Sequence, residues 1–215
     1  MLVAVEGVDG SGKGTQTRLL EERARAEGLS VRVFSFPRYG DNPFADAAAA
    51  FLNAEFGDAP PQLAALPYAG DRWLAKPLLE AALRECDLVV CDRYVASNMA
   101  HQGARLDGDD RAKLLAWLDD LEYGIYGLPR PALTVLLDIP AETAHELVRR
   151  KDARSYTTDA HDMLEGDTRH LAAAQDVYRS LVDDAWHVVD VVHDGELRAP
   201  DEIAEDVWNA VRSRR

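Results

Sequence analysis

The sequence of 215 residues has two cysteines, four lysines and no long apolar run. Cys86 and Cys91 cannot form a disulfide framework, so the sequence does not indicate an oxidising compartment. The longest stretch without a charged residue, 59–70, has 12 residues and three prolines. That stretch is too short to span a bilayer, so we expect no transmembrane segment.

Positive charge is also scarce, because 38 acidic residues face 24 basic ones and leave a net charge of −14. Nucleic acid and anionic membrane surfaces are therefore poor partners. The N-terminus has no basic segment and no cleavage site of the kind that a secretory signal needs. We expect a soluble, cytoplasmic chain that forms one domain over residues 1–215.

Five short apolar runs alternate with longer stretches of helical spacing. The runs cover residues 2–5, 31–36, 88–91, 134–139 and 187–192. This alternation predicts an α/β fold, a five-stranded parallel sheet with helices on both faces. Two stretches, 36–94 and 149–162, break the alternation, and we expect them to be insertions over the carboxyl edge of the sheet, where ligands bind.

A glycine-rich segment follows the first expected strand and opens a helix expected from residue 15 to about residue 27. It consists of Gly7, Val8, Asp9, Gly10, Ser11, Gly12, Lys13, Gly14 and Thr15. Glycines allow backbone N–H groups to surround phosphate oxygens, and the helix N-terminus adds its positive dipole. Lys13 can then reach the β- and γ-phosphates, so the segment predicts a phosphate loop that binds ATP.

One position of this loop departs from the general motif. Gly14 stands where a serine or threonine usually binds Mg²⁺, so the metal needs other ligands. Asp9, Asp92 and Glu165 are the candidates. The chain contains no Asn-Lys-x-Asp motif, which argues against a GTPase.

Two arginines follow expected strands and predict a second anion site. Arg38 comes after the second strand and Arg93 after the third. Carboxyl ends of parallel strands meet at one edge, so both arginines should face the phosphate loop. A single arginine is as well explained by a surface ion pair. Two of them beside a phosphate loop favour a second phosphate group.

These motifs resemble the thymidylate kinases, a family of P-loop nucleoside monophosphate kinases. The matching pieces are residues 7–15, Phe36-Pro37-Arg38-Tyr39-Gly40, Asp71-Arg72, Asp92-Arg93-Tyr94, Ser97-Asn98, Gln102-Gly103, and Asp162 with Glu165. They occur in the family's order and spacing over residues 1–180. The resemblance implies phosphorylation of dTMP to dTDP with ATP and Mg²⁺ for dTTP synthesis, by direct in-line transfer.

The resemblance also implies roles for single residues. Arg38 and Arg93 would hold the dTMP phosphate, Arg72 would donate to thymine O4, and Asn98 would meet the pyrimidine edge. Asp9 would lie between the sugar 3′-hydroxyl and the metal. Glu165 is the second candidate metal ligand. The full substrate set is Asp9, Phe36, Arg38, Tyr39, Tyr68, Arg72, Arg93, Ser97, Asn98, His101, Gln102, Asp162 and Leu164.

Basic residues are absent from the variable positions of the phosphate loop, so the resemblance implies that a lid of about 149–161 supplies them. The candidates there are Arg149, Arg150, Lys151 and Arg154. Together with Lys13 and Arg93, the three lid arginines are the expected catalytic residues. A solvated helix end is the alternative explanation for the lid cluster.

Two positions depart from the family pattern. His101 stands where a tyrosine commonly lies beneath the deoxyribose, and Leu164 stands where an aromatic residue is frequent. The other histidines, at positions 145, 161, 170, 187 and 193, have no metal-ligand spacing, and we expect them to be structural or on the surface.

Three other functions remain open from the sequence. They are a kinase for another nucleoside monophosphate, a deoxynucleoside kinase, and a scaffold that binds nucleotide without turnover. The resemblance further implies a homodimer formed through helix faces, for which the alanine-rich segment 45–54 is one candidate.

Overall fold

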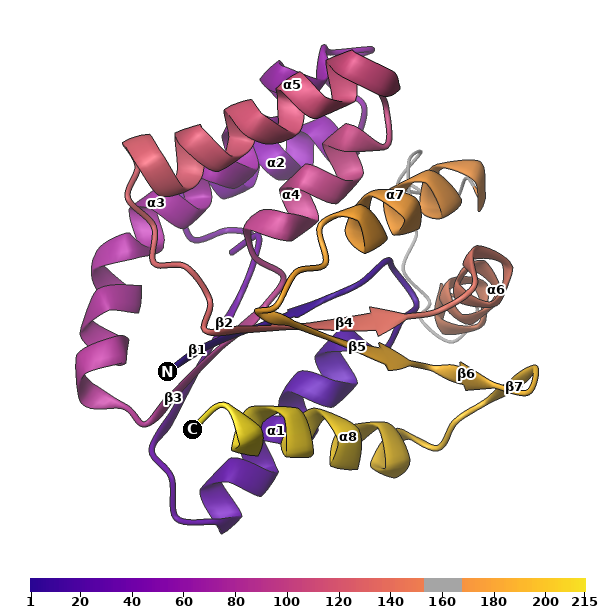
Figure 1. Ribbon diagram of the computed structural model, residues 1–215. Helices are drawn as coiled ribbons and strands as arrows, with labels where there is room; N and C mark the ends of the chain where they lie inside the picture. The colour runs from indigo at the N-terminus through magenta and orange to yellow at the C-terminus, as the bar shows by residue number, and fades with distance from the viewer. Residues whose placement is uncertain (153–167) are drawn as a thin grey trace.

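A computed structural model describes residues 1–152 and 168–215 of the chain (Figure 1). At its centre lies a sheet of five parallel strands, which confirms the predicted fold class. The strands are β1 (Leu2–Glu6), β2 (Val31–Ser35), β3 (Leu88–Asp92), β4 (Leu133–Asp138) and β5 (Trp186–Asp190). Their order is β2-β3-β1-β4-β5, so β1 lies between β3 and β4.

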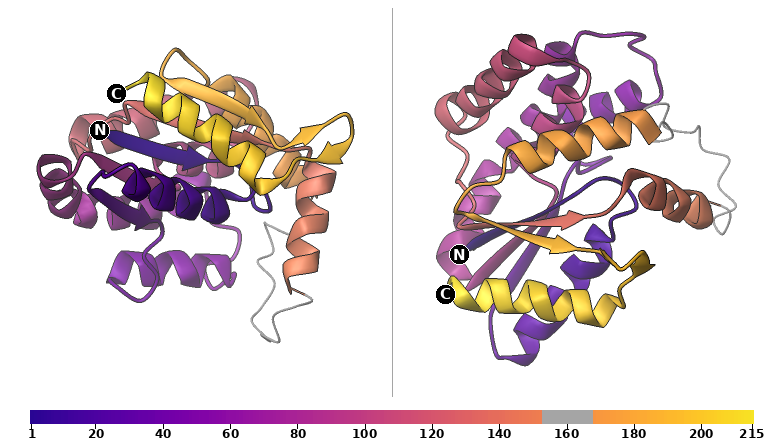
Figure 2. Two further views of the ribbon diagram at one scale, coloured as in Figure 1. Left: turned by 90° about the horizontal axis from the view of Figure 1, so that it is seen from below. Right: turned by 45° about the vertical axis from the view of Figure 1, so that its right-hand side comes forward.

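Helices cover both faces of this sheet (Figures 1 and 2). On one face lie α1 (Lys13–Ala26) and α8 (Pro200–Ser213), which pack against each other. On the other face lie α3 (Pro61–Glu85), α4 (Val95–Gly103), α5 (Gly108–Asp119) and α7 (Thr168–Ser180). Two further helices, α2 (Pro43–Leu52) and α6 (Ala141–Asp152), stand beyond the carboxyl ends of β2 and β4.

Strand β1 shows why both faces are covered. Its five residues are buried, and successive side chains point to opposite faces. Val3 and Val5 pack into the core that contains α1 and α8. Leu2 and Ala4 pack into the core that contains α3 and α4. Glu6 continues this second set, so β1 ends with a carboxylate on the α4 face.

The expected insertion over 36–94 is too broad. Its proline-containing middle begins α3, with Pro61 at a helix start, where the missing N–H costs nothing. Although Pro67 and Pro77 lie inside this 25-residue helix, α3 packs on β3 and α4. It is therefore the crossover from β2 to β3, and among these elements α2 is the addition.

Three differences from the expected elements are larger than a one-residue shift of a strand end. Helix α1 begins at Lys13, two residues before the predicted start. The helical spacing that continues from α5 is a π-helical turn, η1 (Asp120–Ile125). The last strand ends at Asp190, and a hairpin of β6 (Val192–His193) and β7 (Glu196–Leu197) follows. In the described parts of the chain, every helix is too short or too polar to cross a membrane.

Candidate active site

The phosphate loop joins β1 to α1 at the carboxyl edge of the sheet. Gly12 precedes α1 with φ 90, and Gly10 has φ 85, conformations that glycine adopts without strain. A side chain at Gly10 would also overlap the main-chain carbonyl of Ala144 in α6. The loop therefore packs directly against the helix that leads toward residues 149–161.

The Lys13 side chain is held within the loop. Its Nζ donates to the carbonyl oxygen of Val8 at 2.9 Å and lies 3.7 Å from Asp9 Oδ1. Burial, and then the nearby Arg93, lower the pKa of Lys13 to about 8, although the surrounding carboxylates oppose this shift. An anion placed beside this ammonium would raise its pKa again.

Arg93 follows β3 in a left-handed conformation, with φ 64, which is uncommon for a residue with a side chain. Its main-chain N–H donates to the carbonyl oxygen of Val5 at 3.0 Å. Its guanidinium pairs with Asp9, and its Nη1 lies 3.1 Å from His101 Nε2 and 3.4 Å from Ser97 Oγ. Lys13 and Arg93 thus converge on one carboxylate of the phosphate loop.

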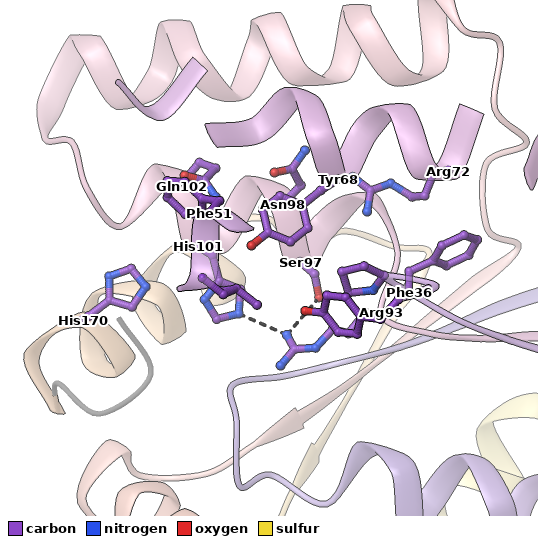
Figure 3. A pocket seen from close by; sticks show the side chains of 13 residues that line it. Phe36, Phe51, Tyr68, Arg72, Arg93, Ser97, Asn98, His101, Gln102 and His170 are labelled. Atoms are coloured by element: carbon purple, nitrogen blue, oxygen red, sulfur yellow. Dashed lines mark hydrogen bonds between the residues drawn. The ribbon is translucent and has the colours of Figure 1, made fainter. Parts of the chain in front are cut away.

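A pocket opens beside Arg93 (Figure 3). The residues of the predicted substrate set that line it are Phe36, Tyr39, Tyr68, Arg72, Arg93, Ser97, Asn98, His101 and Gln102. Pro37, Phe51, Leu52 and His170 also line it and were not predicted. Residues from the segments that follow β2 and β3 and from α2, α3, α4 and α7 therefore meet in one cavity.

At one end of the pocket, buried polar side chains form a hydrogen-bonded cluster with fixed donors and acceptors. Arg72 donates from Nε and Nη2 to the two oxygens of Glu122 at 2.5 and 2.7 Å. Asn98 Nδ2 donates to Glu122 Oε1 at 3.0 Å and to the carbonyl oxygen of Ala65 at 3.1 Å. Asn98 Oδ1 is buried and has no hydrogen-bond partner among the described residues. This end therefore presents an arginine donor beside an amide acceptor.

Arg38 lies outside the residues that line the pocket and is held by Asp71. Its Nε lies 2.9 Å from Asp71 Oδ1, and its main-chain N–H donates to Asp71 Oδ2 at 2.8 Å. Asn42 Nδ2 donates to the same carboxylate at 2.7 Å. The guanidinium is thereby oriented by a fully buried carboxylate.

His101 is an acceptor in this site. A guanidinium can only donate, so His101 Nε2 must accept from Arg93 and carry no proton. Burial, and then the charge of Arg93, lower the pKa of His101 to about 3, in agreement with that assignment. The ring of His170 lies 5.8 Å from that of His101, at an interplanar angle of 26°. His170 thus belongs to the pocket, which the histidine spacing did not reveal.

Sequence reasoning also missed the buried carboxylates Glu6 and Glu122. Both are 0% exposed, and each accepts hydrogen bonds from residues predicted to bind substrate. Glu6 had a usable signal, since it is the lone charge at the end of an apolar strand. Glu122 had none, because its neighbours read as an ordinary helix surface.

Several predicted residues are not tested by this geometry. Arg149 lies exposed near the end of α6, and Arg150 and Lys151 follow it in that helix. Arg154, Asp162, Leu164 and Glu165 lie outside the described residues. Within the described ranges, no three His, Cys, Asp or Glu side chains form a group that could hold a metal.

A phosphate loop at the edge of a parallel sheet, next to an arginine-lined pocket that fits one small ligand, defines a P-loop nucleoside monophosphate kinase. The family model described as thymidylate kinase matches residues 5–197. The chain belongs to the thymidylate kinase family.

Individual relatives agree with this assignment. The chain is 39% identical over 188 residues to thymidylate kinase of Mycobacterium tuberculosis, covering 86% of this chain and 87% of the relative. It is 33% identical over 220 residues to that of Thermomicrobium roseum, covering 97% and 93%. The solved thymidylate kinase of Candida albicans matches with a TM-score of 0.76 at 23% identity, over 99% of this chain and 91% of that one. This last match supports the fold.

Proposed function

We propose that the protein transfers the γ-phosphate of ATP to dTMP and releases dTDP and ADP. The observation that carries the choice of base is the polar end of the pocket. Arg72 has its Nη1 hydrogens available after pairing with Glu122 through Nε and Nη2, while Asn98 offers an acceptor. Thymine presents an acceptor at O4 beside a donor at N3, which complements this pair. Cytosine presents the reverse order at the same two positions.

The aromatic lining supports a nucleobase at this end. Phe36 is buried, and Tyr68 lies on another wall of the pocket (Figure 3). Aromatic faces stack on planar bases and leave the polar edges to decide specificity. We therefore place the base between the aromatic side chains, with its O4 and N3 edge toward Arg72 and Asn98.

The phosphate end of dTMP would then face Arg93, with Arg38 as the second arginine. Lys13 lies near the same Asp9 oxygen that Arg93 contacts and would hold the phosphates of ATP. The dTMP phosphate is largely a dianion near neutral pH, so its oxygen can attack without a general base. Such transfer depends on positioning and charge neutralisation, which Lys13 and Arg93 would supply together.

The residues beside the phosphate loop also suit Mg²⁺. A Cβ at Gly14 would lie 3.5 Å from Asp92 Oδ2, so a carboxylate stands near the position of the missing hydroxyl ligand. Carboxylate oxygens and water are the ligands that Mg²⁺ prefers. We propose Asp9 and Asp92 as residues that hold the ion, directly or through water, with Glu165 as a third. The ion, when bound, would neutralise phosphate charge.

We propose further that Arg149, Arg150 and Arg154, with Lys151, act as lid cations on the transferred phosphate. Closure over the site would exclude water and limit hydrolysis of ATP. A cytoplasmic location, where ATP and nucleotides are available, is part of the same proposal.

A homodimer is proposed on the outer face of α3. Exposed apolar side chains recur along this helix at helical spacing: Leu63, Leu66, Trp73, Leu74 and Leu78. A stripe of this kind is typical of a surface that is covered by a partner. Sedimentation velocity of the wild type against Leu74→Glu would test it, and a monomeric wild type would refute it.

The acceptor specificity is tested by coupled ADP release with ATP, Mg²⁺ and one acceptor at a time. We expect turnover to be strongest with dTMP, lower with dUMP and lowest with dCMP, dGMP, UMP and AMP. Asn98→Ala should reduce the preference for dTMP over dCMP, whereas Asn209→Ala, an exposed asparagine on α8, should not. Nucleotide binding without acceptor-dependent ADP would favour the scaffold.

A further inference from the structure

Glu6 is a carboxylate without exposure to solvent, at the end of β1 directly before the phosphate loop. Burying a carboxylate is costly unless hydrogen bonds compensate for the lost water. Burial raises the pKa of Glu6, while a hydrogen bond from Ser97 and the charge of Arg93 oppose that rise. Because burying this carboxylate costs free energy, we expect a role of Glu6 other than packing.

Four donors converge on this carboxylate. Oε1 accepts from the main-chain N–H groups of Tyr94 at 2.8 Å and Ser97 at 3.3 Å. Oε2 accepts from Ser97 Oγ at 2.6 Å and lies 3.1 Å from the Tyr178 hydroxyl. Tyr94 is the N-cap of α4 but provides no side-chain cap. Glu6 of strand β1 thus caps the N-terminus of α4. The negative charge of Glu6 is also favourable at that end of the helix dipole.

The same hydrogen bonds define the position of Arg93. Glu6 accepts the N–H of Tyr94, the residue directly after the left-handed Arg93. Ser97 has one hydroxyl hydrogen and gives it to Glu6, so its oxygen can accept from Arg93 Nη1, at 3.4 Å. The chain of donors therefore has one direction, from Arg93 through Ser97 to Glu6. Figure 3 shows the Ser97 side chain joined to the guanidinium by a dashed line, on the side away from His170.

Glu6 also reaches the helix that carries His170. Tyr178 lies on α7, and its hydroxyl is 2.9 Å from Ser97 Oγ as well as 3.1 Å from Glu6 Oε2. His170 lies on the same helix and lines the pocket. A single carboxylate therefore joins β1, the Arg93 turn and α7.

We propose that Glu6 is a positioning residue for phosphoryl transfer, which acts through Ser97 by holding the main chain and guanidinium of Arg93 toward the acceptor phosphate. This rests on the proposed role of Arg93 in binding that phosphate. Glu6 itself is not among the residues that line the substrate pocket. Its loss should therefore weaken dTMP binding and turnover more than ATP binding.

The test is a double-mutant cycle of Glu6→Gln and Arg93→Ala, read by steady-state kinetics and by calorimetric titration with dTMP. Glutamine keeps the shape and one acceptor oxygen, but its amide nitrogen meets hydroxyls that donate. We expect Glu6→Gln to raise the dTMP KM or lower kcat by about tenfold to a hundredfold, the effect of losing a hydrogen bond to a charged group. The ATP KM should change less than about threefold. In the Arg93→Ala background the same substitution should add little.

Controls separate positioning from stability. Ser97→Ala removes the link between Arg93 and Glu6 and carries the same cycle if Glu6→Gln does not fold. Tyr178→Phe leaves that link intact and should change the dTMP KM less than Ser97→Ala does. Thr134→Val removes a buried hydroxyl on β4, the strand next to β1, and serves as a control for the loss of a buried polar group. Glu6→Asp should recover part of the activity if the charge matters.

Two results would overturn the proposal. One is a lower melting temperature of Glu6→Gln with unchanged kinetics and dTMP affinity. The other is an equal effect of Glu6→Gln with and without the Arg93 side chain. A wild type that binds dTMP but does not phosphorylate it would instead refute the proposed function, while the calorimetric cycle would still measure the coupling.

Discussion

The pair formed by Arg72 and Glu122 allows a sharp test of how the pocket is built. Both side chains are nearly or fully buried, 3% and 0% exposed, and they share two hydrogen bonds. Glu122→Leu would leave the guanidinium without its counter-charge and remove one acceptor of Asn98. Breaking a buried pair from one side costs about 3–5 kcal/mol. For a chain of this length, that loss corresponds to a melting temperature lower by about 6–20 °C.

A double variant that removes both charges of the pair is the control for Glu122→Leu. Arg72→Met combined with Glu122→Leu replaces both charges with apolar groups of similar size, and such replacements are often neutral or better. We expect the double variant to be more stable than Glu122→Leu alone, in chemical denaturation monitored by circular dichroism. It should nevertheless lose the preference for dTMP over dCMP. A Glu122→Leu variant destabilised by less than about 1 kcal/mol would behave like a surface pair and refute the argument.

Three further outcomes follow from the site. Lys13→Met should be more stable than the wild type near pH 7, because burial lowers the folded-state pKa of Lys13 to about 8 and makes its proton unfavourable. This advantage should shrink as pH rises from 8 toward 10.5, since the folded wild type releases that proton before the unfolded chain does. Denaturation at several pH values measures the stability difference, and a difference that stays constant with pH would contradict the prediction. His101→Tyr should increase the preference for dTMP over its ribonucleotide analogue in the ADP-release assay, and equal ratios would remove His101 from sugar recognition. Cys86 should react with a thiol reagent in the folded protein and Cys91 should react after unfolding only, because Cys91 is buried and its pKa is raised by burial; mass spectrometry distinguishes the two.

Local patterns account for the parts of the structure that the sequence predicted. The strand runs are apolar because both faces of the sheet are covered. The glycines of the phosphate loop recur because the loop has positive φ angles at these positions, which glycine adopts without strain. Arg38 and Arg93 could be assigned to one edge because parallel strands end together. Nine residues of the sequence-based substrate set line one pocket, and their role in binding substrate stays a prediction.

The parts that were missed depend on contacts between distant segments. Glu122 pairs with a residue 50 positions away, and Glu6 reaches Tyr178 across 172 positions. His170 enters the pocket because α7 packs on α4, which no local spacing encodes. The helical character of the α3 start was hidden by its prolines, whose penalty is overcome by packing.

The alternation along β1 has a consequence for how this chain can change. The two-residue alternation of β1 decides which side chains enter each hydrophobic core and on which face Glu6 lies. The neighbouring strands β3 and β4 fix the register of β1. Inserting or deleting one residue in β1 would exchange the two sets of side chains and turn Glu6 toward the core of α1 and α8. The phosphate loop would then begin from the wrong face. Length variation among descendants of this protein should therefore accumulate in loops and helix ends, while β1 changes by substitution alone.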